Sequence, residues 1–400
     1  MRPGSSRARV LLRLRPRSAQ GPSAVTGPPT PPPRPSRGRR PRPLGPPLPS
    51  TDVPSSVTAA ADRARRLRSV APSTLRRLSI ASLVSVAAIV LTGAAVRVTG
   101  SGLGCSDWPT CTKTHLTPPL EFHSLVEFSN RMVTVVLVVL IGATFLAALF
   151  RRPFRRDLAW LAGGLIAGVL AEAVIGGIVV YTKLNPYLVM VHFLATLLLL
   201  VDAVVLVHRT SRDYSAPGRL LVPTPILMLA RGVLVLLAVV VTAGSATTGT
   251  APDGGGASGQ HIAPRIPMAL RDMAELHATL ALFLVGVVLS LAIALHALDV
   301  PERVRKAGRM LVAVLVLQAA VGYAQYFTRL PAALVELHEL GATVLVIGTV
   351  QFFLALTHRL PEHAPVGLRV VPDLVGAAGG QGAPAASAPR PAETTAGLRH

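Results

Sequence analysis

Residues 157–207 read DLAWLAGGLIAGVLAEAVIGGIVVYTKLNPYLVMVHFLATLLLLVDAVVLV, two long apolar runs joined by a short polar connection. The runs are 157–181 and 187–207. Each is long enough to cross the hydrocarbon core of a bilayer, about 30 Å thick, which takes a helix of about 20 mostly apolar residues. This stretch therefore predicts two consecutive transmembrane helices.

Six further apolar runs of similar length occur in the chain. Half of the 400 residues are hydrophobic and only 15% are charged, which is too apolar for an ordinary soluble protein of this length. We therefore predict an all-α polytopic membrane protein. Its eight spans are 78–98, 122–149, 157–181, 187–207, 226–248, 273–297, 308–327 and 333–356.

The formal net charge of +21 is concentrated before the first span. Residues 1–77 hold seventeen Arg and two Asp among many Pro, Ser and Gly residues, and we predict that they are disordered, as are residues 359–400. The basic tail is either a solvated extension or a contact with anionic membrane lipid. It lacks the folded module and interleaved aromatics of a nucleic-acid surface, so we expect no nucleic-acid partner.

Arg and Lys residues are divided unevenly between the two sets of loops. Eleven lie in one set and five in the other, and the basic flank of the first span belongs with the richer set. Since cytoplasmic loops carry the excess of positive charge, this distribution places both termini in the cytoplasm. The first span lacks a small-residue cleavage site, so it is expected to be a signal anchor in the cell membrane.

Sliding the sequence over itself by 146 positions aligns the third and fourth spans with the seventh and eighth. His192 then falls on His338, and Glu172 falls on Gln318. Each half has an even number of spans, so both keep the same orientation, as in parallel-repeat membrane proteins. We predict two four-helix halves, 78–208 and 226–358, joined by a cytoplasmic linker; the linker is 209–225.

Four histidines lie near the external ends of predicted helices: His123, His192, His277 and His338. Polar groups that face lipid are costly, so these rings should point into the bundle. Facing imidazoles at equal depth are what a heme iron needs as axial ligands, and the repeat places His192 and His338 at equal depth. Heme ligation is therefore our interpretation, and a hydrogen-bonded core histidine is the simpler alternative.

The two halves differ where a second ligand is expected. A shift of 147 pairs His277 with Asn130, and an amide is not a plausible iron ligand. The first half therefore has His192 with either a displaced partner, His123, or an open iron face. An open face suits chemistry or exchange of a substrate, whereas two firm ligands suit electron transfer.

Three polar residues of the first half add to the predicted site: Glu127, Arg131 and Glu172. Glu127 lies one turn before Asn130 on the same helix face, and a carboxylate at the mouth of a membrane bundle is a functional candidate. Its alternative role is an ion pair with Arg131. For Glu172, a hydrogen bond between helices is the simplest account.

The only two cysteines, Cys105 and Cys111, lie in the predicted first external loop. An oxidising compartment and the short CSDWPTC segment favour a disulfide. A metal pair is the alternative, but no further thiol lies nearby.

Five segments together resemble the heme A synthase family, in particular actinobacterial-type members with an external-loop cysteine pair. The resemblance covers roughly residues 78–358. Its segments are RVTGSGLGCSDWPTC (97–111), LVEFSNR (125–131), GGIVVYTKLNPYLVMVHFLAT (176–196), TGTAPDGG (248–255) and VGYAQYFTRLPAALVELHELGAT (321–343). Members of this family oxidise the C8 methyl group of heme O to a formyl group, through an alcohol and a geminal diol. The product is heme A for cytochrome oxidase.

The resemblance implies roles for individual residues. His277 and His338 become the axial ligands of a heme b, His192 becomes a ligand of heme O or heme A, and Glu127 matches a glutamate associated with catalysis. The family motif usually reads Glu-x-x-His-Arg, and Asn130 departs from it. Heme propionates are candidate partners of two arginines, whose alternative role is interfacial anchoring: Arg97 and Arg131.

The same resemblance implies heme O as substrate, with heme O synthase and cytochrome oxidase assembly factors as candidate partners. An electron acceptor is also required, and a homo-oligomer is compatible with the fold. Two other functions compete with this one. A b-type cytochrome oxidising quinol explains a bis-histidine site equally well, and a parallel-repeat transporter explains the duplication.

Overall fold

Eight long helices in the described part of the chain are each long and apolar enough to cross a membrane. The computed structural model describes residues 69–113, 117–211, 219–251, 263–298, 300–357 and 359–360. The helices are α2 (Pro72–Val98), α3 (Phe122–Phe150), α4 (Arg156–Tyr181), α5 (Pro186–Thr210), α6 (Thr224–Thr250), α7 (Leu270–His296), α8 (Glu302–Phe327) and α9 (Ala332–Leu356). They confirm the predicted eight-span, all-helical membrane fold.

Two helices begin six residues before the predicted spans. The prediction located only the apolar part of each helix, whereas helical structure continues into the polar region beside it. In α2, Pro72 occupies the first turn, where its missing N–H costs nothing. In α8, Glu302 accepts hydrogen bonds from Arg305 at 2.9 Å and Arg309 at 2.7 Å. Residues 72–77 of the predicted tail are therefore helical; residues 1–68 and 361–400 lie outside the described residues.

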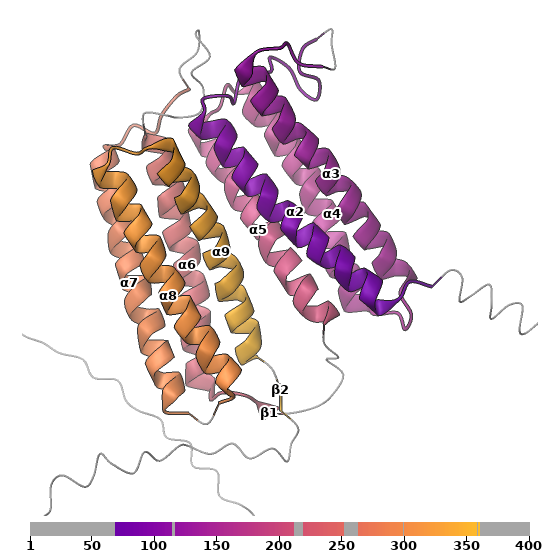
Figure 1. Cartoon of the computed structure of the whole chain (residues 1–400), viewed down its shortest axis with the longest axis vertical. Coiled ribbons are helices and arrows are strands. Elements are labelled where there is room, and N and C mark those ends of the chain that lie inside the picture. The colour runs from indigo at the N-terminus through magenta and orange to yellow at the C-terminus, as the bar shows by residue number, and fades with distance from the viewer. Residues whose placement is uncertain are drawn as a thin grey trace, which may run out of the picture. The chain divides into compact units, whose positions relative to one another are not determined.

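The helices form two four-helix groups (Figure 1). In the first, α2 and α4 each pack against α3 and α5; in the second, α6 and α8 each pack against α7 and α9. The groups pack together chiefly where α9 lies against α2 and α5 and where α5 lies against α6. We call α2–α5 the first half and α6–α9 the second half.

The duplication is visible in the backbone of two turns. Lys183 and Leu184, between α4 and α5, have φ values of 53° and 62°, and Arg329 and Leu330, between α8 and α9, have 64° and 59°. Positive φ is uncommon for residues other than glycine, so two consecutive cases recurring at the offset of 146 are a specific match. In both turns the second residue donates its N–H to the carbonyl five residues earlier, at 2.9 and 2.7 Å. The predicted repeat is confirmed.

Apolar side chains cover the outward faces of the helices. Trp160 is 81% exposed, Leu198 72% and Leu317 65%, which suits a lipid surrounding rather than water.

Two short antiparallel strands were not predicted, β1 (Arg219–Leu220) and β2 (Arg359–Leu360). They pair the linker between the halves with the segment that follows α9. The eight apolar helices make the chain a multi-pass membrane protein. The β1–β2 pair joins its two halves at the end of the bundle where the linker lies.

Candidate functional site

A cavity of about 1250 Å³ lies among helices of both halves. Small-molecule sites usually measure about 300–1,000 Å³, so this cavity exceeds the space that one ordinary ligand needs. Its wall is mostly apolar and includes six of the residues predicted for the site: Arg97, Glu127, Arg131, His192, His277 and His338. The structure therefore brings the predicted groups of both halves to one space.

His277 on α7 and His338 on α9 face each other across the second half. Their ring centres lie 6.3 Å apart and the ring planes are inclined by 79°. A metal between two imidazoles, bonded to each at about 2.0 Å, separates the ring centres by roughly 6 Å. In the described part of the chain no three His, Cys, Asp or Glu side chains form a metal cluster, but a heme needs only axial ligands. The pair fits a bis-histidine heme.

The surroundings of the two rings fix their orientation. Nδ1 of His277 lies 3.0 Å from the carbonyl oxygen of Val240 on α6, an outer contact typical of metal-binding histidines that leaves Nε2 for the metal. Each ring also packs against a glycine of a neighbouring helix. A Cβ added at Gly244 would lie 2.8 Å from Cε1 of His277, and one added at Gly322 would lie 3.0 Å from Cε1 of His338. A larger residue at either glycine would displace the imidazole.

Among the described residues, the first half contributes one imidazole to the cavity wall. His192 on α5 packs beside Gly176, whose added Cβ would lie 3.4 Å from Cε1 of the ring. Asn130 also lines the cavity, but its Oδ1 accepts a hydrogen bond from the Thr92 hydroxyl of α2 at 2.6 Å. The amide is therefore held by α2, in the place where the second half has His277.

His123 is not on this wall among the described residues. Its Nδ1 lies 3.0 Å from the hydroxyl oxygen of Ser101, and its ring contacts that of Phe122. The structure thus places His123 at the junction between the α2–α3 loop and α3. It does not bring His123 together with His192.

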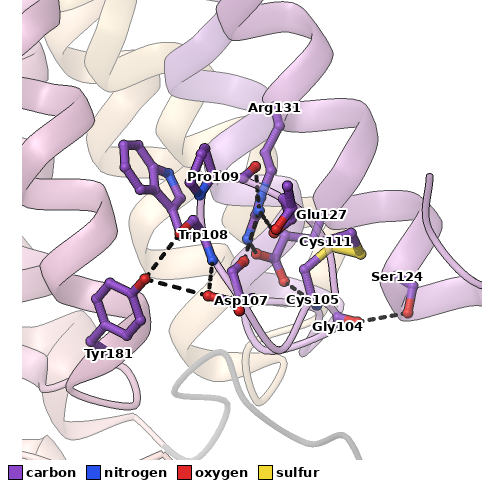
Figure 2. Close-up of polar contacts among 11 residues, drawn as sticks. Gly104, Cys105, Asp107, Trp108, Pro109, Cys111, Ser124, Glu127, Arg131 and Tyr181 are labelled. Carbon is purple, nitrogen blue, oxygen red and sulfur yellow. Dashed lines mark hydrogen bonds and ion pairs between the residues drawn. A yellow bond between two sulfur atoms is a disulfide. The ribbon is translucent and has the colours of Figure 1, made fainter. Parts of the chain in front are cut away.

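Glu127 and Arg131 of α3 hold the loop between α2 and α3 (Figure 2). Glu127 is only 5% exposed; one carboxylate oxygen accepts the Cys105 N–H at 2.8 Å and the other lies 2.5 Å from Arg131. Arg131 also donates to the carbonyls of Asp107 at 2.9 Å and Thr110 at 2.8 Å. The ion pair predicted as the alternative role of Glu127 is present, and Arg131 also binds carbonyl groups of the loop.

Cys105 and Cys111 form the predicted disulfide, and both are fully buried. The loop that they close also packs against α4. The Tyr181 hydroxyl donates to the carbonyl of Trp108 at 2.9 Å, and a Cβ added at Gly177 would lie 3.2 Å from the Trp108 ring (Figure 2). Trp108 also lines the cavity, so the disulfide loop forms part of its wall.

Arg97 connects the halves at the cavity. Its guanidinium, on α2, donates to the carbonyl of Thr248 on α6. It also interacts electrostatically with Glu339 of α9, a carboxylate that lines the same cavity. Arg97 thus brings a positive charge to the cavity wall that also carries the three histidines.

Comparison with known proteins places this site in a family. A family model described as "Cytochrome oxidase assembly protein" matches residues 76–350, more than half of the chain. The chain belongs to this family. The matched region contains all eight helices in whole or in part and every residue assigned to the cavity above.

Individual relatives carry a more specific name. The "Heme A synthase" of Geobacillus kaustophilus (strain HTA426) is 40% identical over 106 residues, which cover 26% of this chain and 32% of that protein. That of Geobacillus thermodenitrificans is 38% identical over 109 residues, 26% of this chain and 32% of the relative. For that of Staphylococcus saprophyticus, 29% identity extends over 146 residues, 36% of this chain and 48% of the relative. The chain thus matches about a third to a half of the length of these relatives.

The contacts of Glu172 at the site were predicted only in part. A hydrogen bond between helices was predicted for Glu172, and its partners are on α5: its Oε2 accepts from the Thr196 hydroxyl at 3.2 Å and lies 2.6 Å from Nδ1 of His192. The repeat supplied the signal, since Glu172 aligns with Gln318 while His192 aligns with His338. Sequence alone did not show that the carboxylate touches the histidine itself.

Proposed function

We propose that this protein is a heme A synthase, which oxidises the C8 methyl group of heme O to a formyl group. The observation that carries the proposal is one cavity bearing a facing pair, His277 and His338, in one half and a single imidazole, His192, in the other. The family match and the relatives named heme A synthase support it. The reaction adds oxygen to the methyl carbon and removes hydrogen, so it requires an electron acceptor.

In the second half, His277 and His338 are the proposed axial ligands of heme b. When bound, heme b supplies one-electron redox chemistry. The protein's own part is to hold the two rings apart at the observed 6.3 Å and to fix the orientation of His277 through the Val240 carbonyl.

In the first half, His192 is the proposed ligand of heme O on one face of its iron. Asn130, held by Thr92, puts no imidazole on the other face, which suits a substrate that must arrive and leave. Glu127 is the proposed catalytic carboxylate. Arg97 and Arg131 both lie on the cavity wall and are the proposed partners of the heme propionates; Arg131 also binds Glu127 and the loop.

We further propose that the protein lies in the plasma membrane with both termini in the cytoplasm. This orientation rests on the uneven distribution of Arg and Lys among the loops. Heme O synthase and cytochrome oxidase assembly factors remain the proposed partners, as supplier of the substrate and recipients of the product.

Pigment analysis tests this proposal directly. The full chain is expressed in a host that makes heme O but no heme A, and the pigments are extracted from the purified protein. Heme A or hydroxylated heme O supports the synthase. Heme B alone would favour a b-type cytochrome. That function would leave Glu127 and the Cys105–Cys111 loop without a role. Protein made with ample heme but lacking any Soret band would favour a transporter.

Substituting Gly244 with alanine is expected to weaken retention of heme b about tenfold. The new Cβ would meet the His277 ring at 2.8 Å and push it off its contact with Val240. The heme-to-protein ratio of the purified variant measures the loss. Gly232→Ala, on the same helix, is the matched control because its Cβ meets nothing within 4 Å. Equal heme content in both variants would contradict the packing role of Gly244.

A further inference from the structure

The histidine of the first half is backed by a carboxylate. Oε2 of Glu172, on α4, lies 2.6 Å from Nδ1 of His192, on α5. The Thr196 hydroxyl donates to the same oxygen at 3.2 Å. This contact sets a carboxylate oxygen beside Nδ1, which has no aligned hydrogen bond among the described residues, and leaves Nε2 on the other side of the ring for a metal.

The repeat supplies an internal comparison for this contact. At the offset of 146, Gln318 replaces Glu172 and His338 replaces His192. The Gln318 amide nitrogen lies 3.1 Å from Nδ1 of His338 and donates to the carbonyl of the same residue at 2.8 Å. In both halves the contact therefore joins equivalent helices, α4 to α5 and α8 to α9, and it involves Nδ1 of the histidine. They differ in that an anionic side chain stands behind one imidazole and a neutral amide behind the other.

The environment of the second oxygen of the Glu172 carboxylate indicates why this half has an anionic side chain. Oε1 is buried and has no hydrogen-bond partner among the described residues. Leaving a buried carboxylate oxygen without a donor is costly, so packing alone does not explain the side chain. A cation on the far side of the imidazole would offset the cost, and a ferric iron bound to Nε2 of His192 is such a cation. Both Glu172 and His192 line the cavity.

We propose that Glu172 is a positioning residue that lowers the reduction potential of the iron bound by His192. This inference rests on the proposed function, which places a heme at that histidine. A negative charge 2.6 Å behind the imidazole makes the ring a more electron-rich ligand, and such a ligand stabilises the ferric state. Gln318 gives His338 no such charge. The chain thus holds two irons at unequal potential, the condition for directed electron transfer between them.

The test is a redox titration of the full-length protein with its hemes bound. His192→Ala first identifies which heme signal belongs to the first half, because that signal disappears. In Glu172→Gln, the ferrous-to-ferric ratio of this heme at a fixed applied potential should rise about tenfold, which is about 59 mV for one electron. The signal of the second half should not move. A retained heme with an unchanged ratio overturns the proposal.

The reciprocal variant keeps the proposal testable if Glu172→Gln loses its heme. Gln318→Glu places a carboxylate behind His338, and the ferrous-to-ferric ratio of the heme in the second half should fall about tenfold. An unchanged ratio there overturns the proposal. Failure of the proposed function gives a different result: His192→Ala would then leave every heme signal of the wild-type protein in place.

Discussion

Replacing His338 with alanine is expected to remove the low-spin heme b spectrum of the purified protein. His338 provides one of two imidazoles whose ring centres lie 6.3 Å apart, and His277 alone cannot coordinate both faces of a heme iron. The reduced-minus-oxidised spectrum and the heme-to-protein ratio measure the effect. We expect the low-spin band to fall by at least about tenfold, since changes to mere outer contacts of metal ligands already cost 10- to 100-fold.

Two further histidine variants make this result specific. His277→Ala should reproduce the loss, because it removes the other member of the pair. His296→Ala is the control: it lies at the far end of α7, where its Nδ1 contacts the Ala292 carbonyl at 2.7 Å, away from the cavity wall. A low-spin band of wild-type intensity in His338→Ala would show that heme b is bound elsewhere.

The sequence predicted the eight spans because the bilayer fixes the length of apolar helix that it accepts. It did not predict where α2 and α8 begin, since hydropathy does not report helix that continues beyond the hydrocarbon. In α8 that extension carries Glu302 and Arg305, and Glu302 also pairs with Arg309 in the predicted span. Such pairs stabilise a helix without adding any apolar signal.

The positions of the candidate site residues could be predicted where periodicity or the repeat carried the information. The repeat placed His192 and His338 at equivalent positions, and the turns before α5 and α9 repeat the same backbone angles. The environment of His123 could not be read in this way. Helical rise gives its depth, but its contact with Ser101 depends on how the α2–α3 loop folds back onto α3.

The same limit applies to Arg131. Its position on α3, four residues after Glu127, predicted an ion pair, and the structure contains one. Its bonds to loop carbonyls depend on the path of the chain between Cys105 and Cys111, which neither composition nor spacing determines. A propionate contact of Arg131 stays a prediction, and the partners that the structure shows for this guanidinium are Glu127 and the loop carbonyls.

Replacing Glu127 with glutamine is expected to leave heme bound but to reduce the formation of heme A by about 10²- to 10⁴-fold, the usual contribution of a general acid or base. The carboxylate is 5% exposed and lies on the cavity wall. Glutamine keeps an oxygen that can accept the Cys105 N–H, but it cannot accept a proton from a reacting group. Chromatography of the extracted pigments should show heme O accumulating in place of heme A.

The contacts of Glu127 require a control that separates catalysis from support of the loop. Arg131→Gln removes the donor to the Asp107 and Thr110 carbonyls but keeps the carboxylate. If Glu127 only anchors the loop, both variants should lose thermal stability and product to the same extent. If Glu127 is catalytic, Glu127→Gln should lose far more product at a similar melting temperature, and Glu121→Gln, exposed at the start of α3, should lose none. Normal heme A production by Glu127→Gln would assign the carboxylate to the loop alone.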